Sequence, residues 1–185
     1  MGLPEFTGDG LLPAGDYELT FPELRKSLLV RGPAEGHPGW DAEWRLHLVD
    51  NLETMVGQLW EVGITEVFAD GSFLEDKEHP NDIDGYFECD LMYFATGQLE
   101  RDLNALDEHK VWTWDHRERR PYRNYPKAQL PMWHVYRVEL YPHYPGARTG
   151  IQDQFGNDKP FPSAFRERRE TDELKGIVKI VKERG

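Results

Sequence analysis

Two aspartates one residue apart, Asp82 and Asp84, end the stretch DGSFLEDKEHPNDID, which begins at residue 70. Because side chains alternate along a strand, both carboxylates can point to one face and converge on one point. Two carboxylates held together repel each other unless a cation lies between them or one takes up a proton. A small set of hard oxygen ligands suits Mg²⁺, which often completes its shell with substrate phosphates. The pair therefore predicts a magnesium site for a phosphorylated substrate.

Gly71 and Ser72 are separated from this pair by nine residues and directly follow an apolar, β-branched segment. Glycine gives the backbone conformational freedom, and exposed N–H groups at the start of a short helix favour phosphate binding. The serine adds a hydroxyl, and Lys77 in the spacer offers a cation. The stretch thus combines donors for a triphosphate with carboxylates for its metal ions.

The arrangement resembles the signature of the nucleotidyltransferase superfamily related to DNA polymerase beta, especially its minimal members. That signature has an apolar residue, Gly, then Gly or Ser, a spacer, and finally Asp, an apolar residue, and Asp or Glu. The chain also resembles a poorly characterised bacterial and phage family with the same minimal core. Three segments carry this resemblance: GSFLEDKEHPNDID, LPAGDYELT upstream of it, and KGIVKI near the end. The resemblance implies a polymerase beta palm-like fold.

The same resemblance implies a third carboxylate on a neighbouring strand, and the best candidate is Glu139 in YRVELYP. Asp82, Asp84 and Glu139 would then be the catalytic residues and would ligate two Mg²⁺ ions, with Mn²⁺ as a substitute. Gly71, Ser72 and Lys77 would bind the nucleotide. Two departures are Glu139, where Asp is commoner, and Gly85, where an apolar residue normally continues the strand and glycine indicates a close approach.

The implied reaction is transfer of a nucleoside monophosphate from an NTP, with ATP favoured, to a hydroxyl group, releasing pyrophosphate. The acceptor would be a protein or an RNA, in a toxin–antitoxin or phage-defence context, and a homodimer or partner protein could complete the site. Two alternatives stay open. One is a catalytically inactive module that binds a nucleotide or a partner, and the other is a metal-dependent phosphohydrolase using the same acids.

The chain length of 185 residues suits one domain. Hydrophobic periodicity predicts an α/β (α+β) protein whose small mixed sheet is flanked by helices. We expect a nucleotidyltransferase core over 40–145, an N-terminal extension over 1–39 packed on it, and a C-terminal extension of the same domain over 146–185.

The secondary structure follows from the same patterns. The expected helices are 21–30, 40–64 and 91–109. The expected strands are 64–70, 83–90 and one within 132–144 that ends at Pro142. The segment 176–181 fits either type.

The charge composition limits the kinds of partner that the chain can bind without a specific site. A net charge of −12 opposes non-specific attraction to nucleic acid unless basic residues are locally concentrated. Such a concentration occurs at 117–127, where Tyr122 and Tyr125 alternate with arginines, a pattern that fits either a solvated loop or a surface for phosphates and bases.

The chain has a single cysteine, Cys89, which excludes an intramolecular disulfide and a multi-cysteine zinc site. It contains no uninterrupted apolar run of about 18 residues. We therefore expect a cytoplasmic protein without a membrane partner.

Overall fold

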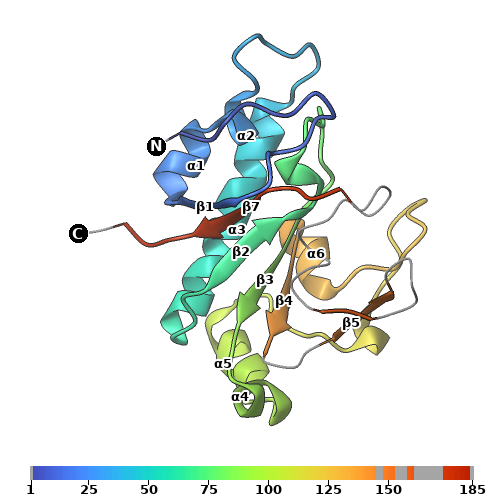
Figure 1. Cartoon of the computed structure of the whole chain (residues 1–185). Helices are drawn as coiled ribbons and strands as arrows, with labels where there is room; N and C mark the ends of the chain where they lie inside the picture. Colours follow the sequence, from blue (N-terminus) through green and yellow to red (C-terminus); the bar gives the residue numbers. More distant parts are fainter. Residues whose placement is uncertain (1, 145–147, 153–157, 161–172, 184–185) are drawn as a thin grey trace.

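The computed structural model describes residues 2–144, 148–152, 158–160 and 173–183. Within them the chain forms one five-stranded mixed sheet, a separate two-stranded sheet and six α-helices, which confirms the predicted α+β class (Figure 1). The strands are β1 (Asp16–Leu19), β2 (Val67–Asp70), β3 (Ile83–Glu88), β4 (Val138–His143), β5 (Arg148–Gln152), β6 (Asp158–Pro160) and β7 (Ile177–Ile180). The helices are α1 (Phe21–Lys26), α2 (Leu28–Arg31), α3 (Ala42–Glu61), α4 (Leu91–Ala95), α5 (Gln98–Leu106) and α6 (Pro131–Tyr136), with 3₁₀ turns η1 (Gly71–Leu74) and η2 (His116–Glu118).

The large sheet has the strand order β1-β7-β2-β3-β4. Strand β3 pairs antiparallel with β2 and parallel with β4. Strand β7 pairs antiparallel with β2 and parallel with β1, so it lies between a strand from the start of the chain and one from the middle (Figure 1). The segment 176–181, which the sequence left undecided, is therefore an interior strand with Ile177, Val178 and Ile180 buried.

The long helix α3 covers one face of this sheet. Asp41 caps it by accepting a hydrogen bond from the Trp44 N–H at 2.9 Å, and apolar residues at three-to-four spacing form its buried face. That face packs in one core cluster with alternate residues of the strands, such as Ile83 and Leu140. No helix in the described part of the chain is both long and apolar enough to cross a membrane.

Three predicted elements are wrong in detail. The helix expected over 21–30 is broken into α1 and α2 at Ser27, whose extended backbone ends α1 and whose hydroxyl caps α2 by accepting a hydrogen bond from the Leu29 N–H.

The other two elements lie later in the chain. The helix expected over 91–109 is broken into α4 and α5 at Gly97, whose φ of 71° is left-handed. The segment 132–144 is not a single strand, because Pro131 begins helix α6 and Arg137, with φ 55°, ends it before β4. Strand β4 also continues through Pro142, which is tolerated because β4 lies at the edge of the sheet.

Arg45 of α3 is completely buried and joins three parts of the fold. Its guanidinium donates hydrogen bonds to the main-chain oxygens of Leu29 and Phe73 at 2.7 and 2.8 Å. It also donates to the oxygens of Glu75 and Lys77 at 3.1 and 2.5 Å, and lies 3.8 Å from the centre of the Trp40 ring. Burial lowers the pKa of Arg45 to about 9, which leaves it charged at neutral pH. A single buried cation thus fixes the loop between β2 and β3 against α2 and α3.

Gly85 lies in β3 where there is no room for a side chain between the neighbouring strands. A Cβ there would collide with the main-chain oxygen of Phe68 on β2 and would lie 2.9 Å from Leu140 Cδ2 on β4. The glycine thus allows a tight backbone approach, as its place in the strand predicted.

We expect Gly85→Ala to lower the free energy of unfolding by at least about 2 kcal/mol, because the added methyl must push β3 away from β2. Urea unfolding measures this. Gly57→Ala in α3 is the matched control, because a Cβ there meets nothing within 4 Å, and we expect it to stabilise the helix by about 0.5–1 kcal/mol. Equal stability of the Gly85 variant and the wild type would contradict the close approach.

Replacing Arg45 with Met should destabilise the fold by about 3–5 kcal/mol, since four carbonyl oxygens lose their donor. Arg25→Met is the control. Its side chain is 29% exposed and pairs with Asp50 and Glu53 at the surface, so its loss should cost no more than about 1 kcal/mol. Similar losses in the two variants would show that the buried hydrogen bonds carry little of the stability.

Candidate active site

Three carboxylates lie in one row across the centre of the sheet. Asp84 on β3 is the register partner of Asp70 on β2 and of Glu139 on β4. Directly paired residues point to the same face of a sheet. The residues that precede them, Ala69, Ile83 and Val138, belong to the core cluster that contains the buried face of α3, so the row faces away from α3. The structure therefore brings two of the three predicted catalytic acids, Asp84 and Glu139, to adjacent positions.

Asp82 lies just before β3, two residues from Asp84. Its Oδ2 accepts a hydrogen bond of 2.6 Å from the indole N–H of Trp133, which is fully buried in α6. Asp82 and Asp84 are both half-buried. An aromatic donor from a neighbouring helix thus fixes the orientation of the first predicted acid.

Gly71 forms the turn that follows β2, with a left-handed φ of 80°. A Cβ at this position would lie 2.8 Å from Asp84 Oδ2, so the turn packs directly against the second acid. Ser72 is the next residue, half-buried in the single 3₁₀ turn η1. The Gly-Ser pair and the Asp pair, separated by nine residues in sequence, are therefore neighbours in space.

Lys77 lies further along the same loop, with its side chain exposed. Its main-chain oxygen is held by Arg45 at 2.5 Å, while its N–H donates to the oxygen of Glu75 at 2.8 Å. The structure thus fixes the backbone of Lys77 and leaves its ammonium group at the surface, beside the loop and not within the row of acids.

Lys175 neutralises the β2 end of the row. Its Nζ lies 3.1 Å from Asp70 Oδ1 and 3.1 Å from Glu75 Oε1, and it donates to the main-chain oxygen of Gly71 at 3.3 Å. Lys175 and Asp70 are both 5% exposed. Burial raises the pKa of Asp70 to about 6, although Lys175 opposes this change. Residues near the end of the described chain thus complete the surroundings of the Gly71 turn.

Glu139 at the β4 end is buried and held by several donors. Its Oε1 accepts a hydrogen bond from the Leu130 N–H at 2.9 Å and lies 3.6 Å from the Arg119 guanidinium. Its Oε2 accepts a hydrogen bond from the hydroxyl of Tyr141. Burial and the nearby Glu139 carboxylate raise the pKa of Tyr141, so the hydroxyl stays protonated and donates. Glu139 is therefore a neutralised, anchored carboxylate in this arrangement.

The donor set fits a magnesium site in part. Asp82 and Asp84 supply two hard oxygen donors near each other, as such a site requires. Among the described residues, however, no group of three or more His, Cys, Asp or Glu side chains is arranged to hold a metal ion. Each Glu139 oxygen already accepts one hydrogen bond, from Leu130 or from Tyr141, and a metal ion beside the pair would have to use the second lone pair of one of these oxygens.

Three residues of this site were missed by the sequence interpretation. Asp70 directly precedes the Gly-Ser turn. Its position, a carboxylate at the end of an apolar strand, was a signal that could have identified it. Lys175 lies in the KGIVKI segment that was noted only for its resemblance, and Arg119 lies in a basic run with no local pattern to single it out. Long-range pairing, which places them at the two ends of the acid row, is not visible in local sequence.

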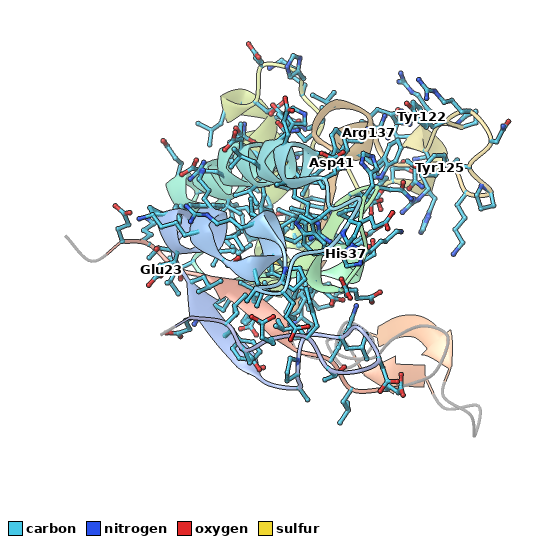
Figure 2. The ribbon with its side chains drawn as sticks, turned by 90° about the horizontal axis from the view of Figure 1, so that it is seen from above. Glu23, His37, Asp41, Tyr122, Tyr125 and Arg137 are labelled. Atoms are coloured by element: carbon cyan, nitrogen blue, oxygen red, sulfur yellow. The ribbon has the colours of Figure 1, made fainter. Side chains whose placement is uncertain are left out.

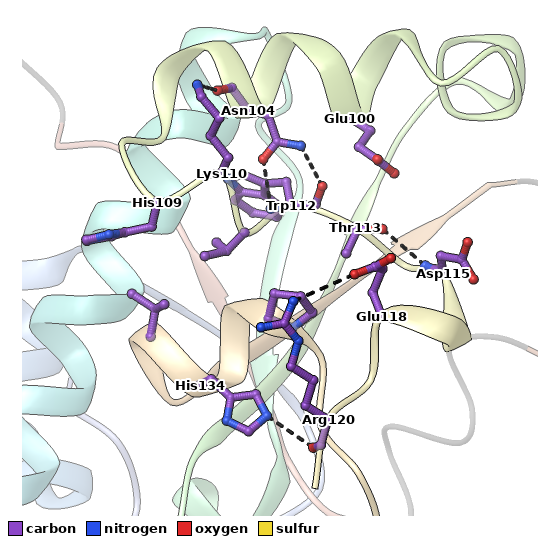
Figure 3. Close-up of a pocket in the computed structure, with 13 residues that line it drawn as sticks. Glu100, Asn104, His109, Lys110, Trp112, Thr113, Asp115, Glu118, Arg120 and His134 are labelled. Carbon is purple, nitrogen blue, oxygen red and sulfur yellow. Dashed lines mark hydrogen bonds and ion pairs between the residues drawn. The ribbon is translucent and has the colours of Figure 1, made fainter. Parts of the chain in front are cut away.

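A separate cavity of about 550 Å³ lies between α5, the loop after it and α6 (Figure 3). Its wall includes the carboxylates of Glu100 on α5 and of Glu118 in the segment after it, together with Arg120 and His134. Burial raises the pKa of Glu100. The cavity contains none of the predicted site residues, so its size alone does not make it the candidate active site.

The pKa of Asp70 predicts a specific pH dependence of stability. Between pH 4 and pH 6 this carboxyl is protonated in the folded chain but ionised in the unfolded chain, so stability falls as pH rises through this window. A rise in pKa from 3.8 to about 6 corresponds to a loss of about 3 kcal/mol. Asp70→Asn lacks this loss, and its stability relative to wild type should therefore increase from pH 4 to pH 7. Urea unfolding at both pH values, with a chelator present, measures the change, and parallel pH profiles would contradict it.

Comparison with known proteins gives one match. A family model described as a family of unknown function (DUF6932) matches residues 4–181. No curated protein and no solved structure matched the chain. The matched range begins before β1 and ends after β7, so it includes every strand of the large sheet. The chain therefore belongs to this family of unknown function, DUF6932.

Proposed function

We propose that this protein is a Mg²⁺-dependent nucleotidyltransferase, which moves a nucleoside monophosphate from an NTP to an acceptor hydroxyl. The observation that carries the proposal is the contact between the Gly71 turn and Asp84, with Glu139 beside Asp84 in register. A phosphate-binding turn and a set of carboxylates at one point are the two parts that such a reaction needs.

The chain order of these parts also supports the proposal. The Gly-Ser turn links β2 to β3, the Asp pair lies at the start of β3, and the third acid lies on the parallel neighbour β4. This is the order implied by the resemblance to the polymerase beta superfamily. The palm-like core is proposed on this ground.

In the proposed reaction, Gly71 and Ser72 bind the triphosphate, and Lys77 adds a contact from the loop. Asp82 and Asp84 hold the metal ions, and Trp133 keeps Asp82 in position. The bound ions would lower the pKa of the attacking hydroxyl and stabilise the leaving pyrophosphate. A bond forms between the acceptor oxygen and the α-phosphorus, the bond from that phosphorus to the pyrophosphate oxygen breaks, and the hydroxyl proton is released.

A nucleotide-binding module without transferase activity is the second candidate. It is favoured by the state of Glu139, whose two oxygens each already accept a hydrogen bond, from Leu130 and from Tyr141, while the Arg119 guanidinium lies 3.6 Å from Oε1. A carboxylate held in this way stabilises the sheet and need not ligate a metal. The Asp pair and the Gly71 turn would then bind a nucleotide without completing the catalytic set.

The test is incubation of the purified protein with each α-³²P-labelled NTP and Mg²⁺, alone, with total RNA and with a cell lysate. We expect label on an RNA or protein band with wild type, and loss of the label to background with Asp82→Asn and with Asp84→Asn, because the metal ligands are removed. Glu88→Gln is the matched control, since Glu88 is an exposed carboxylate further along β3 on the same face. It should leave transfer unchanged.

Undiminished transfer by both Asp variants would exclude this site as the catalytic centre. Thermal stabilisation by an NTP with Mg²⁺, without any transfer, would support the binding module. Release of labelled nucleoside monophosphate without an acceptor would indicate a phosphohydrolase.

A further inference from the structure

A cluster of aromatic rings and arginines lies next to Asp82. It consists of Tyr122, Tyr125, Trp133, Arg123 and Arg137, which we call the aromatic–arginine cluster. The rings of Tyr122 and Tyr125 meet the Trp133 ring edge-on, at centroid distances of 5.0 and 5.3 Å. The Arg137 guanidinium lies 3.9 Å from the centre of the Trp133 ring and 4.3 Å from that of Tyr122. Figure 2 shows Tyr122, Tyr125 and Arg137 together at one edge of the molecule.

The inner and outer members of the cluster differ in exposure. Trp133 is completely buried and donates to Asp82, so it ties the cluster to the candidate active site. Tyr122 and Tyr125 keep part of their rings at the surface, and Arg123 is exposed. The cluster is therefore a surface-exposed group of side chains that packs on the buried ring of Trp133.

Positive charge is concentrated around these rings. Between residues 117 and 137 the chain has six Arg or Lys and one acidic residue, although its overall net charge is −12. Arg117 pairs with Asp115, and Arg119 lies beside Glu139. Within the described residues, the side chains of Arg123, Lys127 and Arg137 form no ion pair, although the guanidinium groups of Arg123 and Arg137 lie 5.1 and 4.3 Å from the centre of the Tyr122 ring. A cation over an aromatic ring keeps its charge, so all three can still contact an anionic partner.

We propose that the aromatic–arginine cluster binds single-stranded nucleic acid. Bases stack on Tyr122 and Tyr125, and Arg123, Lys127 and Arg137 contact phosphates. Partly exposed rings beside unpaired cations match this ligand, because unpaired bases offer flat faces and the backbone offers regularly spaced charges. An acidic peptide would use the cations without needing the rings, and a duplex hides its base faces.

The inference also names an acceptor, and this part rests on the proposed function. A strand bound at the cluster lies beside Trp133, and Trp133 contacts Asp82. We assign the terminal hydroxyl of that strand as the acceptor in the proposed reaction. Binding of the strand itself depends only on the cluster.

The experiment measures fluorescence anisotropy of labelled single-stranded RNA, single-stranded DNA and the corresponding RNA duplex, each of about ten nucleotides. Titrations are made without NTP and with a chelator, so that the result does not depend on a metal. We expect the single strands to bind and the duplex to bind more weakly by about tenfold or more. Equal binding of RNA and DNA means that the sugar is not read, whereas preference for one identifies the natural ligand.

Matched variants separate stacking from charge. The pair Tyr122→Ala and Tyr125→Ala should weaken binding by about tenfold or more, while the pair to Phe, which keeps the rings, should stay within about threefold. Arg123→Ala with Lys127→Ala should reduce the slope of log affinity against log salt by about 0.7 for each lost phosphate contact. Arg117→Ala is the control, because this exposed arginine is already paired with Asp115, and it should change affinity by no more than about twofold.

Several results would overturn the inference: no binding of either single strand at low salt, equal binding of the duplex, or no effect of the Tyr-to-Ala pair in a variant that melts like wild type. The proposed function fails separately. Asp82→Asn with Asp84→Asn should still bind the strands, so binding without any transfer by wild type contradicts the transferase alone. Transfer to a protein without nucleic-acid binding contradicts the cluster inference alone.

Discussion

Electrostatic repulsion within the acid row is the constraint around which the centre of this molecule is built. Asp70, Asp84 and Glu139 occupy adjacent register positions, where like charges destabilise a sheet. The fold opposes the repulsion at both ends, with Lys175 beside Asp70 and Arg119 beside Glu139. Burial also raises the pKa of Asp70, which lowers the charge of the row below pH 6. Lys175 and Arg119 are thus fixed cations at the two ends of the row.

Precise placement of the row depends on contacts that no larger residue would allow. Gly71 packs against the Asp84 carboxylate, and Gly85 lets β3 approach the backbone of β2. Arg45 holds the connecting loop from below through the oxygens of Phe73, Glu75 and Lys77. Together these contacts fix the backbone around the acids, and the proposed reaction would require such a preorganised site.

Local sequence predicted the parts of the fold that depend on periodicity and on single turn residues. The helix around 40–64, the strands near Asp70 and Asp84, and the tight passage at Gly85 all follow from such signals. The prediction for 132–144 was wrong because the near-alternating residues Trp133, Val135, Val138 and Leu140 resemble a strand, whereas Pro131 starts a helix there. The nature of 176–181 could not be predicted, because its pairing partners lie more than 100 residues away.

In the candidate site, too, some features follow from local sequence and others depend on contacts between distant segments. The spacing of Gly71 and Asp84 was informative because the two lie on consecutive strands joined by one loop. The partners of the row come from distant segments, since Lys175 contacts Asp70 and Arg119 lies beside Glu139. Such contacts depend on topology and leave no periodic trace in the sequence. The hydrogen bonds of Glu139 to Leu130 and Tyr141 likewise depend on side-chain geometry, which local sequence does not reveal.

The position of β7 has a consequence for how the chain reaches this structure during synthesis. The strand that separates β1 from β2 is made last, so the interior of the sheet cannot close while the ribosome is still producing the preceding residues. Until then β1 has no strand beside it, and one edge of β2 stays open to pairing with other chains. Pairings over such long sequence separations also slow folding. Until the segment that also supplies Lys175 is synthesised, the unpaired edges of β1 and β2 are therefore exposed to pairing with other chains.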